Sequence, residues 1–531
     1  MSALVLLVLW AWPADAAREV PLVEAARNLD TQAVQDLLDR SADVNAPAVD
    51  GSTALHWAVH RGANELVDLL IDAGADVTVA NRYGVRPLSL ASVIGRADVI
   101  ERLLEAGANP NTSLPGGETA LMTAARTGVA AAIRVLVAHG ADVNARDEIH
   151  GQTAMMWAAA RGNAEAIHVL AEVGGDVHAR TERRVQTPGG SYSGRPNLMK
   201  SPDPTGFTPV MFAVRAGHLD AVRVLLEAGA NVNDTLSDGQ SVLVVATANA
   251  NWELADYLLD KGADPNRAGA GWNALHQTVR TRRMNLNFGL PGPIPSGTVD
   301  SVDVIKKMLA KGVDVNARMT RNGMKDGQRN RFNRLGATAF LLAAKITDVE
   351  AMKILLEAGA DPNIKSAENT TPLMVAAGVD IWNPGEDGGS LTGQEDEVLE
   401  AVRMCVALGN DVNAVNDLGV TALHGAAYRG VNIVAEYLVE QGAKLDARDT
   451  NGWIPWAIAH GFSYSNFYKA QAHTAALLAG YMEERGLSTE DETIPGSVCF
   501  DCQTRAGYVQ SELERDIRME AEYAVTHGLA K

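Results

Sequence analysis

The chain has 531 residues, of which 47% are hydrophobic, 21% are charged and only 5% are aromatic. This composition is typical of a folded, soluble protein, and the low aromatic content suits thin layers packed with alanine, leucine and valine. The formal net charge of −19 argues against DNA or RNA as the main ligand, because binding to phosphates requires a positive field. A local basic surface remains compatible with this overall charge.

Residues 1–17 contain an apolar run, Ala3–Trp12, which is followed by the sequence PADAA. An apolar run before small residues is typical of a secretory signal peptide, and we expect cleavage after Ala16 or Ala17. The run is shorter than the roughly 20 residues that a membrane-spanning helix needs. We therefore predict an exported protein, periplasmic or secreted, with no membrane contact beyond the cleaved signal. An uncleaved anchor or a mis-assigned start is the alternative.

From about residue 20 to residue 486 the sequence repeats itself at a spacing near 33 residues. The segment TALH at residues 53–56 returns as RPLS at 86–89 and as TALM at 119–122, each 33 residues further on. We take the threonine of TALH as position one of the unit. Position one then falls at twelve residues: Val20, Thr53, Arg86, Thr119, Thr153, Thr208, Ser241, Asn273, Thr338, Thr371, Thr421 and Ile454. The first and last are degenerate, as terminal repeats commonly are.

Each unit predicts two short helices. Threonine at position one is a good N-cap, and the proline or alanine that follows it is compatible with a first helical turn. A glycine near position ten, such as Gly62 or Gly95, suits a left-handed end to the first helix. A V-x-x-L-L pattern, as at residues 222–226, predicts the second helix, which ends at a Gly-Ala-Asp sequence such as residues 74–76.

This unit resembles the ankyrin repeat, with its T-P-L-H-x-A-A, V-x-x-L-L and G-A-D-V-N sequences, over about residues 20–486. The resemblance implies an all-α solenoid of stacked helix–turn–helix units with hairpin-like fingers. Its concave face, built from inner helices and fingers, usually binds another protein. We divide the chain into a signal peptide at 1–17, a solenoid at 18–486 and a tail at 487–531. We expect a monomeric, non-enzymatic scaffold for protein–protein interaction, without a cofactor.

Four insertions interrupt the spacing, near residues 182–204, 283–302, 319–335 and 381–399. The first and third fall in fingers and are basic, whereas the fourth lies between two helices and is acidic. Insertions in a repeat array map to loops and commonly mark the binding face. We therefore predict that the basic fingers, with Arg183, Arg184 and Arg331, bind a partner; solvated loops without function are the alternative.

Positions eight and nine of the unit lie at the end of the first helix and, by the resemblance, tend to face the partner. None of the twelve units places Asp or Glu there. The basic residues at these positions, which we call the basic ladder, are His60, Arg61, Arg126, Arg161, Arg215, Arg280, Lys345 and Arg429. We predict that the ladder steers and binds a protein with an acidic surface. The alternative is that these residues only reflect the usual composition of the repeat family, in which arginine is common at these positions.

The remaining chemically active residue types follow the repeat. His56, His276 and His424 stand at position four, where the resemblance implies hydrogen bonds between units. Trp57 and Trp157 stand at position five, where a large side chain packs along the groove. The sequence contains no P-loop, H-E-x-x-H or G-x-S-x-G motif, and no carboxylate pair stands apart from the repeat. We therefore expect no catalytic residues and no metal site.

The cysteines are the one signal outside the repeat. Cys499 and Cys502 form a C-x-x-C in the tail, and export favours a local disulfide between them. A redox or metal role is the alternative, in which the solenoid serves as a docking arm. Haem attachment is disfavoured because Gln503 stands where C-x-x-C-H requires histidine. We expect Cys405 to be a small core residue.

Beyond the C-x-x-C, apolar residues recur at a spacing of four: Val509, Leu513, Ile517 and Ala521. This spacing predicts an amphipathic C-terminal helix. An open solenoid end exposes apolar surface, so we expect this helix to cap the last unit. Docking to a partner is the alternative.

Overall fold

The computed structural model describes residues 20–182, 205–283, 295, 297–322, 332–381, 395–461, 470–489 and 518–528. In these ranges the regular structure is helical, with isolated β-bridges at Ser113–Thr119 and Thr235–Ser241 and no longer strands. The expected all-α solenoid class is confirmed. The chain separates into a first unit at residues 1–231 and a second unit at residues 232–531.

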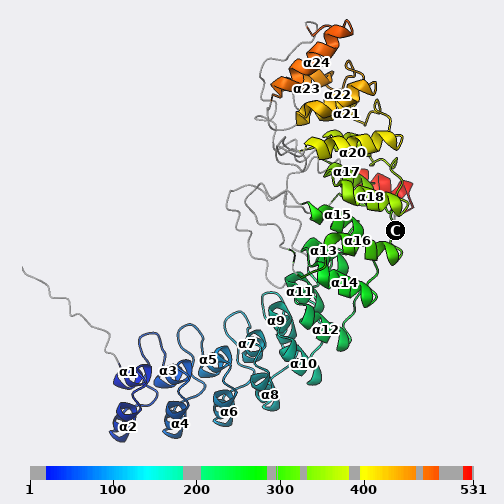
Figure 1. Cartoon of the computed structure of the whole chain (residues 1–531). Coiled ribbons are helices and arrows are strands. Elements are labelled where there is room, and N and C mark those ends of the chain that lie inside the picture. Colours follow the sequence, from blue (N-terminus) through cyan, green and yellow to red (C-terminus); the bar gives the residue numbers. More distant parts are fainter. Residues whose placement is uncertain are drawn as a thin grey trace, which may run out of the picture. The chain divides into compact units, whose positions relative to one another are not determined.

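The first unit consists of short helices in pairs (Figure 1). They are α1 (Pro21–Arg27), α2 (Thr31–Asp39), α3 (Ala54–His60), α4 (Asn64–Asp72), α5 (Pro87–Ile94), α6 (Ala97–Glu105), α7 (Ala120–Thr127), α8 (Ala130–Ala138), α9 (Ala154–Arg161), α10 (Ala164–Glu172), α11 (Pro209–Ala216) and α12 (Leu219–Glu227). Each odd-numbered helix packs against its even-numbered partner and against the next odd-numbered helix. We call the odd-numbered helices the inner helices and the even-numbered helices the outer helices.

The second unit repeats the arrangement of inner and outer helices. They are α13 (Val242–Ala248), α14 (Trp252–Asp260), α15 (Ala274–Arg282), α16 (Ser301–Ala310), α17 (Ala339–Lys345), α18 (Val349–Glu357), α19 (Pro372–Ala377), α20 (Glu395–Ala407), α21 (Ala422–Arg429), α22 (Asn432–Glu440), α23 (Pro455–Ala459) and α24 (Ala472–Glu484). The outer helix α20 begins at Glu395, inside the insertion predicted at 381–399, and is 13 residues long. A further helical segment covers residues 518–526.

Every inner helix begins directly after a residue assigned to position one. The N-caps of the inner helices are Val20, Thr53, Arg86, Thr119, Thr153, Thr208, Ser241, Asn273, Thr338, Thr371, Thr421 and Ile454. At Thr119, for example, the hydroxyl accepts a hydrogen bond from the backbone N–H of Met122 at 3.2 Å. This bond satisfies one of the donors that a helix start leaves open.

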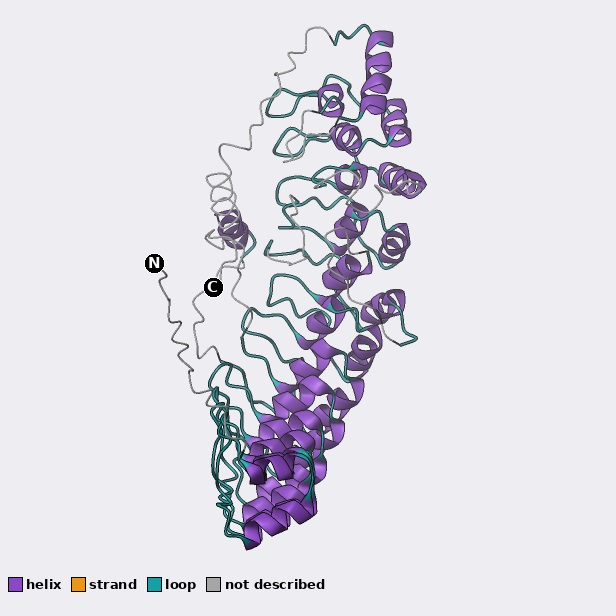
Figure 2. Ribbon diagram, turned by 90° about the vertical axis from the view of Figure 1, so that its left-hand side faces the viewer, coloured by secondary structure: helices purple, strands orange, loops and turns teal. Residues whose placement is uncertain are grey.

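Loops link each outer helix to the next inner helix and project to one side of the helix rows (Figure 2). In most of the described fingers, an asparagine joins one loop to the next, whereas Thr78 and His178 stand at its position in two others. The amide of Asn111 donates to the carbonyl of Gly140 at 2.9 Å and accepts from the N–H of Asp142 at 2.7 Å. The same pair of bonds joins Asn144 to the loop that follows. The polar backbone of these fingers is therefore bonded from unit to unit.

The position-four histidines also bond between units, as the resemblance implied. The Nδ1 atom of His56 accepts from the backbone N–H of Thr53 at 3.1 Å, so its Nε2–H donates to the carbonyl of Val85, also at 3.1 Å. His276 and His424 contact the carbonyls of Ala317 and Trp453 in the same way, at 3.0 Å. Burial lowers the pKa of all three histidines, and that of His276 falls to about 4.

Acid should therefore destabilise the chain through His276. Its pKa is about 4 in the folded chain and 6.5 in the unfolded chain, so only the unfolded chain binds a proton between these values. The histidine's contribution is complete above pH 6.5 and lost as the pH falls to 4, a change of about 3 kcal/mol. Urea unfolding at pH 7, 5.5 and 4 measures it. His276→Gln should show a shallower pH dependence, and equal dependence in both proteins would contradict the prediction.

The C-terminal helical segment does not cap the last unit, so that expectation is wrong. Residues 518–526 lie on the finger between α16 and α17, where Glu520 accepts a hydrogen bond from the N–H of Asn322 at 2.8 Å. Tyr523 is 9% exposed in this position. The predicted apolar face is also not the buried one, because Ala521 is exposed while Tyr523, on another side of the helix, is buried.

Candidate interaction surface

The basic ladder of the first unit lies at the C-terminal ends of α3, α7, α9 and α11. His60, Arg61, Arg161 and Arg215 are exposed, and the side chain of Arg126 is 35% exposed. Helix geometry explains this placement, because positions eight and nine follow the last buried turn of each inner helix. The structure therefore makes these five side chains accessible to a partner.

Aromatic side chains hold several of the guanidinium groups in place. Arg126 lies over the ring of Trp157 at 5.3 Å from the centroid. Arg215 lies over Phe207 at 4.8 Å and over Phe212 at 5.4 Å. Such stacking contributes roughly 0.5–1 kcal/mol at exposed sites and limits the freedom of the long side chain. Each of these arginines thus presents a preordered positive charge.

Sequence reasoning missed one member of this arrangement. Arg27 stands at position eight of the degenerate first unit, and its guanidinium lies 4.5 Å from the ring centroid of Trp57. Trp57 also contacts His60 edge-on, with 5.8 Å between ring centroids. Counting position eight through the degenerate unit would have found Arg27. In two places in the first unit, the arginine at position eight of one inner helix therefore stacks on the tryptophan at position five of the next inner helix.

Few acidic groups neutralise the ladder of the first unit. Arg126 forms an ion pair with Glu118 at 3.3 Å. Within residues 20–182 and 205–231, no ion pair involves Arg61, Arg161 or Arg215. Exposed arginines at the other helix row are paired instead, as Arg134 is with Glu172 at 3.1 Å. In this unit, acidic side chains therefore neutralise arginines on the outer helices more than they neutralise the basic ladder on the inner helices.

The ladder residues of the second unit are buried. Arg280, Lys345 and Arg429 are 7%, 7% and 4% exposed. The Nζ of Lys345 donates to the carbonyl of Asp380 at 3.1 Å, and Nη1 of Arg429 donates to the carbonyl of Ala376 at 3.0 Å. These side chains already bond within the chain, so accessible ladder residues belong to the first unit.

The early end of α19 explains the burial of Lys345 and Arg429. The inner helix α19 stops at Ala377, and the chain then passes through Gly378 with φ at +122° toward the insertion. Val379 and Ile381 are fully buried by this turn. Val379 crosses α21 at Gly425, where an added Cβ would lie 2.6 Å from the backbone nitrogen of Val379. The insertion thus begins as a covering over the inner helices.

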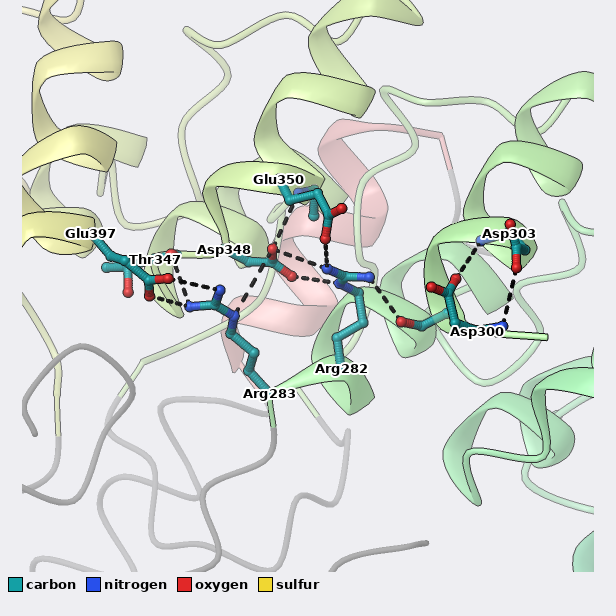
Figure 3. Close-up of polar contacts among 10 residues, drawn as sticks. Arg282, Arg283, Asp300, Asp303, Thr347, Asp348, Glu350 and Glu397 are labelled. Carbon is teal, nitrogen blue, oxygen red and sulfur yellow. Dashed lines mark hydrogen bonds and ion pairs between the residues drawn. The ribbon is translucent and has the colours of Figure 1, made fainter. Parts of the chain in front are cut away.

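A network of charged side chains connects α15, α18 and α20 in the second unit (Figure 3). Asp348 is fully buried between two arginines, at 2.6 Å from Nε of Arg282 and 4.0 Å from Nε of Arg283. Arg282 also binds Glu350 at 2.8 Å, and Arg283 binds Glu397 at 2.6 Å. This network lies where two predicted insertions leave the helices. Arginines just past the end of an inner helix are the only sequence signal for it.

The other sequence predictions fall elsewhere. Arg183, Arg184, Arg331, Cys499, Cys502 and the signal peptide at 1–17 lie outside the described residues. Cys405 is fully buried in α20, as expected for a core residue, and burial raises the pKa of its thiol to about 12. Where the structure describes the chain, no group of three His, Cys, Asp or Glu side chains is arranged to hold a metal ion.

Comparison with protein-family models gives matches along the same stretches. The family described as ankyrin repeats in three copies matches residues 22–114, 110–181 and 193–269. The single ankyrin repeat matches residues 335–367 and 418–450, and all these stretches together cover more than half of the chain. The chain belongs to the ankyrin-repeat family. Ankyrin repeats indicate a scaffold for protein–protein interaction, and proteins of this kind are generally not enzymes.

Several curated proteins share the repeats of this ankyrin-repeat chain. It is 26% identical over 268 residues to the E3 ubiquitin-protein ligase KEG of Arabidopsis thaliana, which covers 47% of this chain and 15% of the relative. It is 31% identical over 176 residues to the nuclear factor NF-kappa-B p105 subunit of Gallus gallus, which covers 32% of this chain and 15% of the relative. The likeness to transient receptor potential cation channel subfamily A member 1 of Homo sapiens is 27% over 267 residues, covering 50% and 20%.

The ankyrin-repeat chain therefore spans less than a quarter of the length of each of these relatives. What they share with it is the repeat region. Among the helices that the structure describes, none is both long and apolar enough to span a membrane. The comparisons support a protein partner. The kind of partner has to be inferred from the exposed residues of this chain.

Proposed function

We propose that this ankyrin-repeat protein is an exported, monomeric, non-enzymatic scaffold that binds another protein through its concave face and its basic fingers. One observation carries the proposal. The inner helices of the first unit present accessible basic residues, of which Arg126 and Arg215 stack on aromatic rings, and no acidic residue stands at positions eight and nine.

Preordered arginines and tryptophans favour binding for two reasons. A stacked guanidinium loses less side-chain entropy when it binds, and tryptophan and arginine are the residue types that contribute most at interfaces. Trp57 and Trp157 are each partly exposed beside such an arginine. A complementary partner would carry carboxylates above an apolar patch.

The sign of the charge suggests an acidic partner. The chain as a whole carries −19, so a non-specific acidic protein is repelled, and only a surface that meets the ladder is attracted. Electrostatic steering raises association rates and weakens with salt, since exposed charges are screened beyond roughly 8 Å at physiological ionic strength. Binding to the ladder should therefore weaken as salt rises.

Affinity capture from an extract of cells that produce the protein tests the proposal. Reversing Arg61, Arg161 and Arg215 to Glu should lower the recovered partner at least ten-fold. The matched control reverses Arg102, Arg134 and Arg223 on outer helices, which gives the same change in net charge. The control should recover the partner as the wild type does. Equal recovery with both variants would contradict a role for the ladder.

Export predicts the state of the three cysteines. Cys405 is buried and its thiol is protonated, so it should not react in the folded chain. If Cys499 and Cys502 are joined, thiol titration of the unfolded protein gives one group before reduction and three after it. Two reactive thiols in the folded, air-exposed protein would instead favour the redox alternative, with the solenoid as a docking arm.

A further inference from the structure

The finger between α16 and α17 holds the chain's own C-terminal helix. Three contacts join them. The N–H of Asn322 donates to Oε1 of Glu520 at 2.8 Å, and the ring centroid of Tyr523 lies 5.9 Å from the guanidinium of Arg318. The amide of Asn333 points to the sulfur of Met519 at 3.8 Å. A helix 198 residues further along the chain than Asn322 thus fits this finger.

The finger is fixed independently of the helix. Arg318 donates from Nε to the carbonyl of Gly336 at 3.0 Å and from Nη2 to the carbonyl of Lys365 at 2.6 Å, so its guanidinium is tied to two successive fingers. The N–H of Met319 donates to the carbonyl of Ala337 at 2.9 Å. The N–H of Arg334 donates to Oδ1 of Asn322 at 3.0 Å within the finger. We call residues 318–322 and 332–335 the dock.

The helix meets the dock with one narrow face. Met519 and Glu520 are half-buried and Tyr523 is buried, one turn apart on the same side of the helix. Val525, on the opposite side, is 70% exposed. His527 stacks on Tyr523 with 4.0 Å between ring centroids, and burial raises the pKa of the Tyr523 phenol.

Residues 518–526 by themselves would form only a marginal helix. Isolated helices shorter than about 12 residues are marginal in water, so helix formation and docking are coupled. The contacts described are one hydrogen bond to a carboxylate, one guanidinium beside a tyrosine ring and one amide–sulfur contact. The helix is tethered to the dock because both belong to one chain. This linkage gives a high effective concentration, which makes such a small contact effective. Without the tether, the same contact is weak and exchangeable.

We propose that the dock is a binding site for a short helix that carries glutamate and, three residues later, tyrosine, and that residues 518–528 occupy it reversibly in cis. This site goes beyond the proposed function, since it needs no external partner. A protein that presents such a helix to the dock would first displace the chain's own terminus.

A labelled synthetic peptide of residues 514–531 tests the dock with the full-length protein. In the vacated variant, Glu520→Lys with Tyr523→Ala, the cis helix no longer competes. The peptide should bind this variant at least ten-fold more tightly than it binds the wild type, as measured by fluorescence anisotropy. Val525→Ala is the matched control on the exposed side of the same helix, and it should bind the peptide as weakly as the wild type does.

The contribution of the tyrosine to binding needs its own test. A peptide with Tyr523→Ala should bind none of the proteins, and this change leaves the dock itself intact. Equal binding of the natural peptide to the wild type and the vacated variant, or no binding to either, would overturn the proposal. A wild-type dimer that dissociates in the vacated variant, seen by light scattering, would overturn the cis assignment because a second copy would then supply the helix.

Discussion

Asp348→Ala is expected to destabilise the second unit by about 3–5 kcal/mol, the usual effect of removing one partner of a buried ion pair. The Asp348 carboxylate is fully buried between Arg282 and Arg283. It also caps α18 by accepting a hydrogen bond from the N–H of Ala351 at 3.2 Å. The side chain of Arg282 is only 9% exposed. Removing the Asp348 carboxylate therefore leaves a buried guanidinium without its main negative partner. Urea unfolding followed by circular dichroism measures the change.

Asp300→Ala provides the matched control. Asp300 caps α16 in the same way, accepting from the N–H of Asp303 at 2.9 Å, but it is exposed and forms no ion pair with a described arginine. Loss of such a cap typically costs about 1 kcal/mol. If the two alanine variants lose equal stability, the buried network contributes nothing beyond helix capping and our interpretation of it is wrong.

Gly425→Ala is expected to destabilise the same unit by roughly 1–3 kcal/mol, although alanine favours helices over glycine. Gly425 lies inside α21, and an added Cβ would lie 2.6 Å from the backbone nitrogen of Val379. A backbone atom has no other rotamer to adopt, so the segment that covers Arg429 must shift. Such a shift would also expose Val379 and Ile381, which are fully buried in the structure. Thermal unfolding measures the loss of stability.

The same substitution in α24 should have the opposite sign. Gly480 lies inside that helix, and nothing lies within 4 Å of an added Cβ. Gly480→Ala should therefore stabilise by about 0.5–1 kcal/mol through helix propensity alone. A Gly425→Ala protein that is as stable as Gly480→Ala would show that the chain after α19 does not lie across α21.

The sequence predicts the part of the fold that depends on local physics. Capping, helix length and turn chemistry recur every 33 residues, so the starts of the inner helices follow from the phase of residues such as Thr119 and Thr371. The bonds of His56 and its counterparts also follow, since each links a unit only to its neighbour. Interactions of this range are the ones that a repeat pattern encodes.

The rest depends on contacts between distant residues. Arg429 has the same position in its unit as Arg161, yet it is buried because Gly378 turns the chain over it. Arg283, at the end of α15, and Glu397, in the first turn of α20, are 114 residues apart, so no pattern within one repeat predicts that they meet. The spacing of four residues predicts the C-terminal helix but not the face that docks, because Ala521 is exposed and Tyr523 is buried, and nothing in residues 518–528 indicates a contact with Arg318.

We propose that the inner helices of the first unit bind the partner. Covalent side-chain footprinting of the captured complex, which compares labelling of the free and the bound protein, locates the surface that the partner covers. We expect protection of Trp57, Trp157 and their neighbouring inner-helix side chains, with unchanged labelling of the outer-helix residues around Arg134 and Arg223. Protection of the outer helices with the inner helices still labelled would contradict it.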